Sequence, residues 1–169
     1  YSPRVGVTHM TGAEMITYVE RMNLLRRDKH ELGDVLGMTE ANAIQMTYFR
    51  NNTMHLMVLP SAIASCFQNN RQVRTEDIQR LAWRIYPYLC DELFLRWNET
   101  GLAPVVLEIT HEMATHGLLV SHDEGASWIR PEVGTAEAVQ LSVLGQLSMQ
   151  IIERYYLAIA LLLKAGSGR

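Results

Sequence analysis

The sequence predicts a mainly α-helical (α+β) protein, a helical domain that also carries two small β-hairpins. Most apolar residues recur at spacings of three and four, which is the period of an amphipathic helix. Capping residues stand before several of these stretches, as expected at helix starts. Two leucine-rich stretches instead run into charged, glycine-containing turns, which predicts hairpins rather than helices.

The first elements are a helix and a hairpin. Thr11 and Glu14 form a capping-box pattern, so a helix should begin there and run to about Met22. The next segment, "LLRRDKHELGDVLGM", has apolar ends and a charged middle that contains glycine. This pattern breaks the helical period and predicts a β-hairpin with a loose loop.

A second helix should follow Thr39, which stands in the capping position. We expect this helix to break at Asn51-Asn52, because asparagine side chains compete for backbone hydrogen bonds. It should then resume and run to about Phe67. Pro60 lacks a backbone donor, so a kink or a restart is expected near it.

The third helix should begin at a cap on Thr75, after a loop formed by "NNRQVRT". Pro87 should bend it midway, and "NETG" should end it. Its apolar stripe has spacings of three and four. The residues of the stripe are Ile78, Leu81, Ile85, Leu89, Leu93 and Trp97.

Three further elements complete the chain. A helix should run from residue 103 to about 116 and close at Gly117. The stretch "LLVSHDEGASWIR" should form the second hairpin, with "DEGAS" as its turn. The last helix should run from about residue 135 to 164. Its wide apolar surface predicts a central buried helix, or one packed against another domain or a membrane surface.

A helix that leads into a Leu-Leu strand and a hairpin thus occurs twice along the chain. This is the outline of a winged-helix-like helix–hairpin module. We therefore predict a single domain over residues 1–169, built from two such modules at about 1–70 and 71–169.

The composition suits an ordered globular domain, with 48% hydrophobic residues and a formal charge of −3. Residues 1–84 hold ten basic and eight acidic residues (+2), and residues 85–169 hold five and ten (−5). This balance is no nucleic-acid signature. Cys66 and Cys90 both lie in apolar helical contexts and are predicted to be reduced core residues. No apolar run reaches the roughly 18 residues that a membrane span needs.

One candidate site is a polar group inside an otherwise apolar segment, formed by Arg50, Asn51, Asn52 and His55. Spacings of three and four bring most of these side chains near one another on a helix. They could hold a helix–helix junction, where asparagine side chains cap free backbone groups. Alternatively, they could face an active site.

A second candidate is a local cationic group, formed by Arg71, Arg74, Arg80 and Arg84. The four side chains could be a solvated face. Alternatively, they could contact a phosphate or an anionic lipid surface, because arginine binds phosphate in a bidentate manner.

Catalytic and cofactor motifs are absent from the sequence. It contains no G-x-S-x-G, no glycine-rich phosphate loop and no His with an Asp five residues on that could serve as an acyltransferase base. His111 and His116 are five residues apart, so they point to different helix faces and do not match a zinc-protease motif. We predict no catalytic residue, no cofactor and no metal site.

Several stretches together resemble one known family. They are "YSPRV", "GAEMITYVE", "KHELGDV", "TYFRNNTMHLMVLPSAIA", "IYPYLCDELFLRW" and "ERYYLAIALLL". Taken together they are similar to the C-terminal region of the bacterial membrane-bound glycerol-3-phosphate O-acyltransferases (PlsB type). The resemblance covers nearly the whole chain.

The resemblance implies a parent enzyme that lies peripherally on the cytoplasmic side of the cell inner membrane. Such an enzyme transfers an acyl group from acyl-CoA or acyl-carrier protein to the sn-1 hydroxyl of glycerol 3-phosphate, and its product, lysophosphatidate, begins phospholipid synthesis. In this family the catalytic His-x4-Asp lies upstream, in an acyltransferase domain that would be the partner of this chain. The chain is therefore expected to be a non-catalytic C-terminal fragment that is inactive alone.

The alternative hypothesis is a stand-alone winged-helix module that binds a protein partner or DNA. Winged helices that bind DNA usually present basic surfaces. The second wing, "SHDEGAS", is acidic, and the net charge is negative, which counts against DNA. No nucleic-acid partner is expected.

Overall fold

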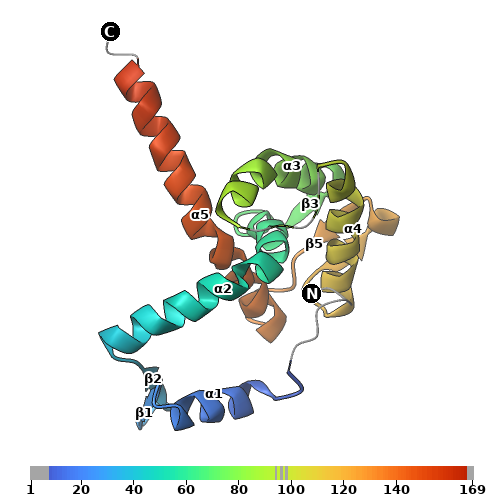
Figure 1. Cartoon of the computed structure of the whole chain (residues 1–169). Coiled ribbons are helices and arrows are strands. Elements are labelled where there is room, and N and C mark those ends of the chain that lie inside the picture. Colours follow the sequence, from blue (N-terminus) through green and yellow to red (C-terminus); the bar gives the residue numbers. More distant parts are fainter. Residues whose placement is uncertain (1–7, 94, 96, 98, 167–169) are drawn as a thin grey trace. The chain divides into compact units, whose positions relative to one another are not determined.

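The computed structural model describes residues 8–93, 95, 97 and 99–166 of the chain. These residues form five α-helices and two small antiparallel sheets, shown in Figure 1. The predicted mainly helical fold is thereby confirmed; the two predicted hairpins are present, and one of them belongs to a three-stranded sheet. In chain order the elements are α1 (Gly12–Arg21), β1 (Arg26–Asp28), β2 (Val35–Gly37), α2 (Glu40–Ser65), β3 (Gln72–Arg74), α3 (Thr75–Glu92), α4 (Glu99–Thr115), β4 (Val120–His122), the 3-10 turn η1 (Asp123–Gly125), β5 (Ser127–Ile129) and α5 (Ala136–Gly166).

The chain divides into two compact units, and the boundary lies inside α2, between Thr53 and Met54. The first unit contains α1, β1, β2 and the N-terminal part of α2. The second unit contains the rest of α2 and the elements from β3 to α5.

In the first unit, α1 begins at the predicted capping box. The Thr11 hydroxyl accepts a hydrogen bond from the Glu14 N–H (3.3 Å), and the Glu14 carboxylate accepts one from the Thr11 N–H (2.7 Å). These hydrogen bonds lower the pKa of Glu14 below its usual value, because they favour the ionised carboxylate. The prediction of a helix start at this position is confirmed.

The predicted first hairpin is also confirmed, because β1 and β2 pair antiparallel with Arg27 opposite Leu36. The Arg27 guanidinium makes ion pairs with Glu20 at the end of α1 (2.8 Å) and with Asp34 (3.2 Å). One cation therefore links the hairpin to the helix that precedes it.

The predicted break in α2 at Asn51-Asn52 is wrong, because α2 is one helix from Glu40 to Ser65. The Asn51 side chain accepts a hydrogen bond from the Arg50 guanidinium (3.2 Å) instead of competing for the backbone. Pro60 lies inside the helix, so no restart occurs there. The predicted cap is confirmed, since the Thr39 hydroxyl accepts from the N–H of Asn42 (3.2 Å).

The second unit contains a three-stranded sheet in the order β3-β5-β4, with Val73 and Ser121 on either side of Trp128. The predicted hairpin of β4 and β5 is confirmed. The prediction of a loop throughout "NNRQVRT" is wrong, because Gln72–Arg74 form strand β3. A strand of three residues has no periodic pattern of its own, and its partner β5 lies far along the chain.

The core of the second unit lies between its helices and the sheet. Trp128 of β5 is fully buried and packs with apolar side chains from every helix of the unit. The buried residues of this cluster are Leu59, Ile63, Ala64, Phe67, Ile78, Ala82, Tyr86, Leu102, Val106, Ile109, Met113, Leu118, Leu119, Trp128, Leu141 and Leu144.

Thr75 does not cap α3 as predicted, because it is the first residue of the helix and Arg74 is the N-cap. Its hydroxyl donates to the carbonyl oxygen of Gly125 (2.6 Å) and accepts from Trp128 Nε1 (2.9 Å). Thr75 thus joins the start of α3 to the turn and the second strand of the hairpin.

The predicted apolar stripe of α3 is only partly correct. Ile78 and Leu89 are buried, but Leu81 is exposed, and Ala82 and Tyr86 occupy the buried positions between them. The helix also ends at Glu92 and not at "NETG", and α4 already begins within that stretch. The short connection between the two helices is held in part by the Tyr86 hydroxyl, which donates to the Trp97 carbonyl oxygen (2.6 Å).

A close contact joins α2 and α5. The Ser61 hydroxyl donates to the Ser148 hydroxyl and accepts from the Ser148 N–H, both at 2.8 Å, and both side chains are buried. One turn earlier on α5, Gly145 faces the backbone of Ala64 and Ser65. The absence of a side chain at Gly145 allows the two helix backbones to approach.

The two cysteines have different environments, although both are free. Cys66 is largely buried, and this burial raises the pKa of its thiol to about 11. Cys90 is exposed, so the prediction of a core position is wrong. It directly follows the buried Leu89, and one step along the helix turns its side chain toward solvent.

Candidate functional site

The structure places the polar group of α2 mainly at the surface. Arg50 is half-buried, whereas Asn51, Asn52 and His55 are exposed. The Arg50 guanidinium donates to Asn51 Oδ1. The boundary between the units follows Thr53, so Arg50 and Asn51 belong to the first unit and His55 belongs to the second.

Nearby carboxylates form ion pairs with most members of the predicted cationic group. Arg71 pairs with Glu132 (3.0 Å), while Arg74 and Arg80 both pair with Asp77 (2.8 and 2.7 Å). The hydrogen bond from Arg74, with help from Arg80, lowers the pKa of Asp77. Arg84 is exposed, and no ion pair is found for it within the described part of the chain. Three of the four guanidinium groups are therefore ion-paired, and two of them share one carboxylate.

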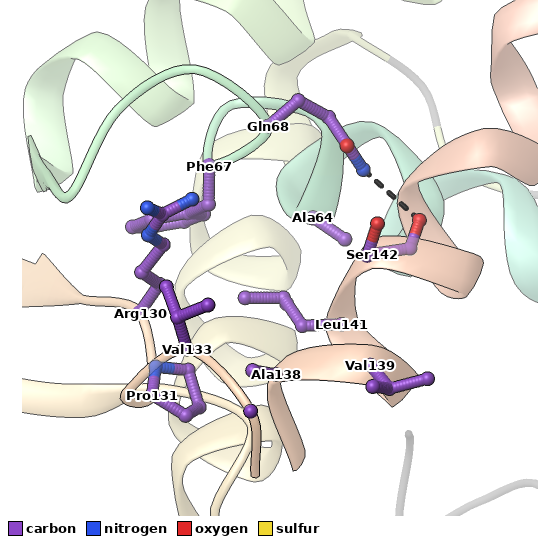
Figure 2. A pocket seen from close by; sticks show the side chains of 11 residues that line it. Ala64, Phe67, Gln68, Arg130, Pro131, Val133, Ala138, Val139, Leu141 and Ser142 are labelled. Carbon is purple, nitrogen blue, oxygen red and sulfur yellow. Dashed lines mark hydrogen bonds between the residues drawn. The ribbon is translucent and has the colours of Figure 1, made fainter. Parts of the chain in front are cut away.

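A cavity of about 230 Å³ lies beside the start of α5, between the end of α2 and the segment after β5. Figure 2 shows its side chains, with the Gln68 amide donating to the Ser142 carbonyl oxygen (3.0 Å). Its lining is mostly apolar and carries one charged side chain, that of Arg130. Arg130 could not be recognised from the sequence, because a lone arginine after a strand gives no periodic or motif signal. The described lining carries the hydroxyl of Ser142 but neither a carboxylate nor a histidine that could activate it.

A His–Ser–Asp grouping in the hairpin resembles a catalytic triad but does not have its geometry. Asp123 Oδ2 (2.8 Å) and Ser127 Oγ (3.2 Å) both approach the same ring nitrogen, Nδ1 of His122. A triad needs the serine and the carboxylate on opposite nitrogens of the imidazole. Ser127 is also buried and accepts from the Gln72 side chain (2.8 Å), so this group fixes the hairpin onto β3.

The two histidines near the end of α4, His111 and His116, contact an aromatic and an acidic side chain. The His111 ring packs edge-on against Trp128, at 5.0 Å between ring centroids, and His116 contacts Glu112 (3.4 Å). Among the described residues no group of three or more metal-ligating side chains occurs.

The most unusual surface is the end of α5, residues 156–163, which we call the apolar tail. Every side chain in it is exposed, and the large ones expose between 41% and 72% of their surface. Figure 1 shows this end of α5 extending beyond the rest of the second unit. The large residues are Tyr156, Leu157, Ile159, Leu161, Leu162 and Leu163. None of the helices that the structure describes has the length and apolar character of a membrane span.

The base of the apolar tail is fixed to α3. The rings of Tyr155 and Tyr88 lie 5.3 Å apart, and Arg154 pairs with Glu92 (3.6 Å). Desolvation at this contact, together with the negative charge of Glu92, raises the pKa of Tyr155. The tail therefore starts from a defined position on the second unit.

Comparison with known proteins gives a consistent result. Residues 1–169 match the family model "Glycerol-3-phosphate acyltransferase C-terminal region". The chain is 41% identical to the glycerol-3-phosphate acyltransferase of Xanthomonas axonopodis pv. citri (strain 306), over 99% of the chain and 19% of that protein. It is 40% identical to the protein of the same name from Pseudomonas aeruginosa (strain UCBPP-PA14), over 98% of the chain and 20% of that protein.

No solved structure matches the chain. The chain spans about a fifth of the length of the curated relatives that it matches. Because the family match extends over the whole sequence, the resemblance inferred from the sequence is confirmed. The chain belongs to the family of glycerol-3-phosphate acyltransferase C-terminal regions.

Proposed function

We propose that the chain is the non-catalytic C-terminal part of a glycerol-3-phosphate 1-O-acyltransferase. The parent enzyme would transfer an acyl group from acyl-CoA or acyl-carrier protein to glycerol 3-phosphate, giving lysophosphatidate for phospholipid synthesis. It would act peripherally at the cytoplasmic side of the inner membrane. The observation that carries this proposal is the match of the entire chain to the C-terminal region of relatives five times its length.

The chemistry of the described residues supports a non-catalytic role. Acyl transfer to a hydroxyl needs a base that removes the proton of the attacking oxygen. The sequence has no His with an Asp five residues on, and Asp123 and Ser127 share one ring nitrogen of His122, so this group is no Ser–His–Asp triad. The catalytic base would therefore lie in another part of the parent.

The topology of the second unit supports a winged-helix-like module within this region. From α2 to β5 the order is helix, strand, helix, helix, strand, strand, and the sheet order is β3-β5-β4. In this arrangement α4 would correspond to the helix that DNA-binding winged-helix proteins insert into a groove of DNA. Its exposed face carries Glu108, and the adjoining turn carries Asp123 and Glu124, so a protein contact fits better than a nucleic acid. The first unit, in which α1 precedes a hairpin, would be a smaller module of the same kind.

The main experiment assays turnover by the purified 169-residue chain with acyl-CoA and glycerol 3-phosphate. The expected result is no product, whereas the full-length parent assayed in parallel is active. Turnover by the chain alone would refute the proposed role. A salt-dependent titration with duplex DNA tests the alternative of a stand-alone DNA-binding module. We expect no binding.

We also propose that the polar group at Arg50, Asn51, Asn52 and His55 contributes to the contact with the acyltransferase domain. Its exposed amides and imidazole are available for hydrogen bonds to a partner. In the full-length enzyme, replacing Arg50 and Asn51 by alanine should lower activity or thermal stability. Unchanged activity and melting would remove this contact from the proposal.

A further inference from the structure

The apolar tail of α5 differs in kind from the first half of the same helix. The first half buries one stripe, made of Leu141, Leu144, Ser148 and Ile151, and leaves its other sides in water. In the tail, three consecutive leucines at positions 161–163 are all exposed. Successive helical residues point about 100° apart, so the tail is apolar on all sides.

A helix that is apolar on all sides is normally enclosed by its surroundings. Burial of one side would leave several large side chains in water, which disfavours a flat contact surface. Whatever covers the apolar tail must therefore surround it and not merely contact one side.

A lipid bilayer fits this requirement poorly. A helix that lies in the membrane interface needs a polar face toward water, and residues 156–163 provide none. A helix that spans a bilayer needs roughly 20 apolar residues, whereas the tail is about 12 Å long. The chain also lacks a basic cluster there, since Arg154 is paired with Glu92 and residues 85–169 carry ten acidic and five basic residues.

A second copy of the chain also fits poorly. Two helices that pair side by side cover one stripe on each partner. The remaining faces of both tails would stay in water. By contrast, about four fifths of the length of the relatives lies outside the matched region, which is enough protein to form a socket.

We propose that the apolar tail of α5 inserts into an apolar socket formed by the rest of the full-length parent, outside this chain. This inference rests on the proposed function, because it assigns the chain's contact with the remainder of the enzyme to residues 156–163. The tail starts from the Tyr88–Tyr155 contact, so its insertion would fix the second unit onto that remainder.

Thiol labelling tests the enclosure directly. Leu162→Cys places a thiol in the tail, and Gln146→Cys places a matched control at an exposed polar position on the same helix. Both variants are made in the full-length parent and in the 169-residue chain, with Cys90 replaced by serine. They are labelled with a water-soluble maleimide, without lipid, and modification is read peptide by peptide by mass spectrometry.

In the full-length parent, the thiol at 162 should react at least about tenfold slower than the thiol at 146, because a buried site reacts only when it opens. In the 169-residue chain the two rates should be similar. Equal rates in the parent would overturn the proposal. Protection that needs added phospholipid vesicles would assign the tail to a bilayer, and protection that grows with protein concentration would assign it to self-association; either result overturns it.

The failure of this inference is distinguishable from failure of the proposed function. Turnover by the 169-residue chain would refute the non-catalytic role while the labelling rates could still show an enclosed tail. Conversely, an inactive chain whose tail labels freely in the parent would leave the non-catalytic role intact and remove the socket.

Discussion

A few single side chains link segments that lie far apart along the chain. Thr75 joins the start of α3 to the turn and the second strand of the hairpin, because its hydroxyl donates one hydrogen bond and accepts another. Ser61 and Ser148 do the same between α2 and α5. Such bonds contribute little net energy, but leaving a buried partner unsatisfied is costly.

Replacing Thr75 by valine tests how much the hydrogen bonds of its hydroxyl stabilise the chain. Valine keeps the shape but removes the hydroxyl, so the Trp128 indole N–H and the Gly125 carbonyl lose their partner. We expect the free energy of unfolding to fall by about 1–3 kcal/mol. Thr75→Ser keeps the hydroxyl and should cost less. Urea denaturation followed by tryptophan fluorescence measures both, and an equal loss for both variants would contradict this role of the hydroxyl.

The two cysteines provide a second prediction at this scale. Burial raises the pKa of the Cys66 thiol to about 11, so the thiol stays protonated until the pH approaches that value. At pH 8 about one molecule in a thousand would carry the reactive thiolate. Cys90 is exposed and should react first with a water-soluble disulfide reagent.

The variants Cys66→Ser and Cys90→Ser identify which thiol reacts. The rate of Cys66 should rise by about tenfold for each pH unit between 8 and 10, as its thiolate fraction rises. Comparable rates for the two cysteines at pH 8 would show that Cys66 is more accessible than the structure indicates.

At the scale of elements, most of the fold could be predicted where capping and periodicity agree. The capping box at Thr11 and the glycine stop at Gly117 both lie where the sequence placed them. The failures have local physical causes. Strand β3 is too short to have a period, and the Asn51 amide bonds the side chain of Arg50 and leaves the helix backbone intact.

The candidate sites were harder to predict than the elements. Sequence position showed that four arginines are close along the chain, but not that two of them pair with Asp77. Ion pairing across one helical turn depends on rotamers, which a sequence does not specify. The cavity beside Arg130 is formed by segments far apart in the chain, so no local pattern could reveal it.

The approach of α2 and α5 at Gly145 gives a prediction for these elements. A Cβ there would lie 3.2 Å from the backbone of Ala64 and Ser65 and would collide with the Gln68 side-chain amide. Gly145→Val should therefore destabilise the chain by about 1–3 kcal/mol or more through overpacking. The control Gly166→Ala, at an open position, should change stability little. Thermal unfolding measures both variants, and a tolerated valine would mean that the helices can separate there.

At the scale of the whole molecule, the two units differ in how much they bury. Within the described part of the first unit, Leu24 is the one buried residue, whereas the second unit has an extended core around Trp128. A unit with so little buried apolar surface has little to oppose the entropy of the unfolded chain. The first unit should therefore open more readily than the second in the isolated chain.

Native-state hydrogen exchange tests this difference. Amides of α1 and of the hairpin β1–β2 should exchange through openings that cost at least about 2 kcal/mol less than those of α3 and α4. Leu24→Ala should speed exchange in the first unit alone, because the buried clusters of the second unit do not include Leu24. Ile63→Ala should lower protection in the second unit. Two results would contradict this prediction: equal protection of α1 and α3, or a Leu24→Ala effect that extends to α4. Either would show that the chain opens as one cooperative body and that the two units do not unfold separately.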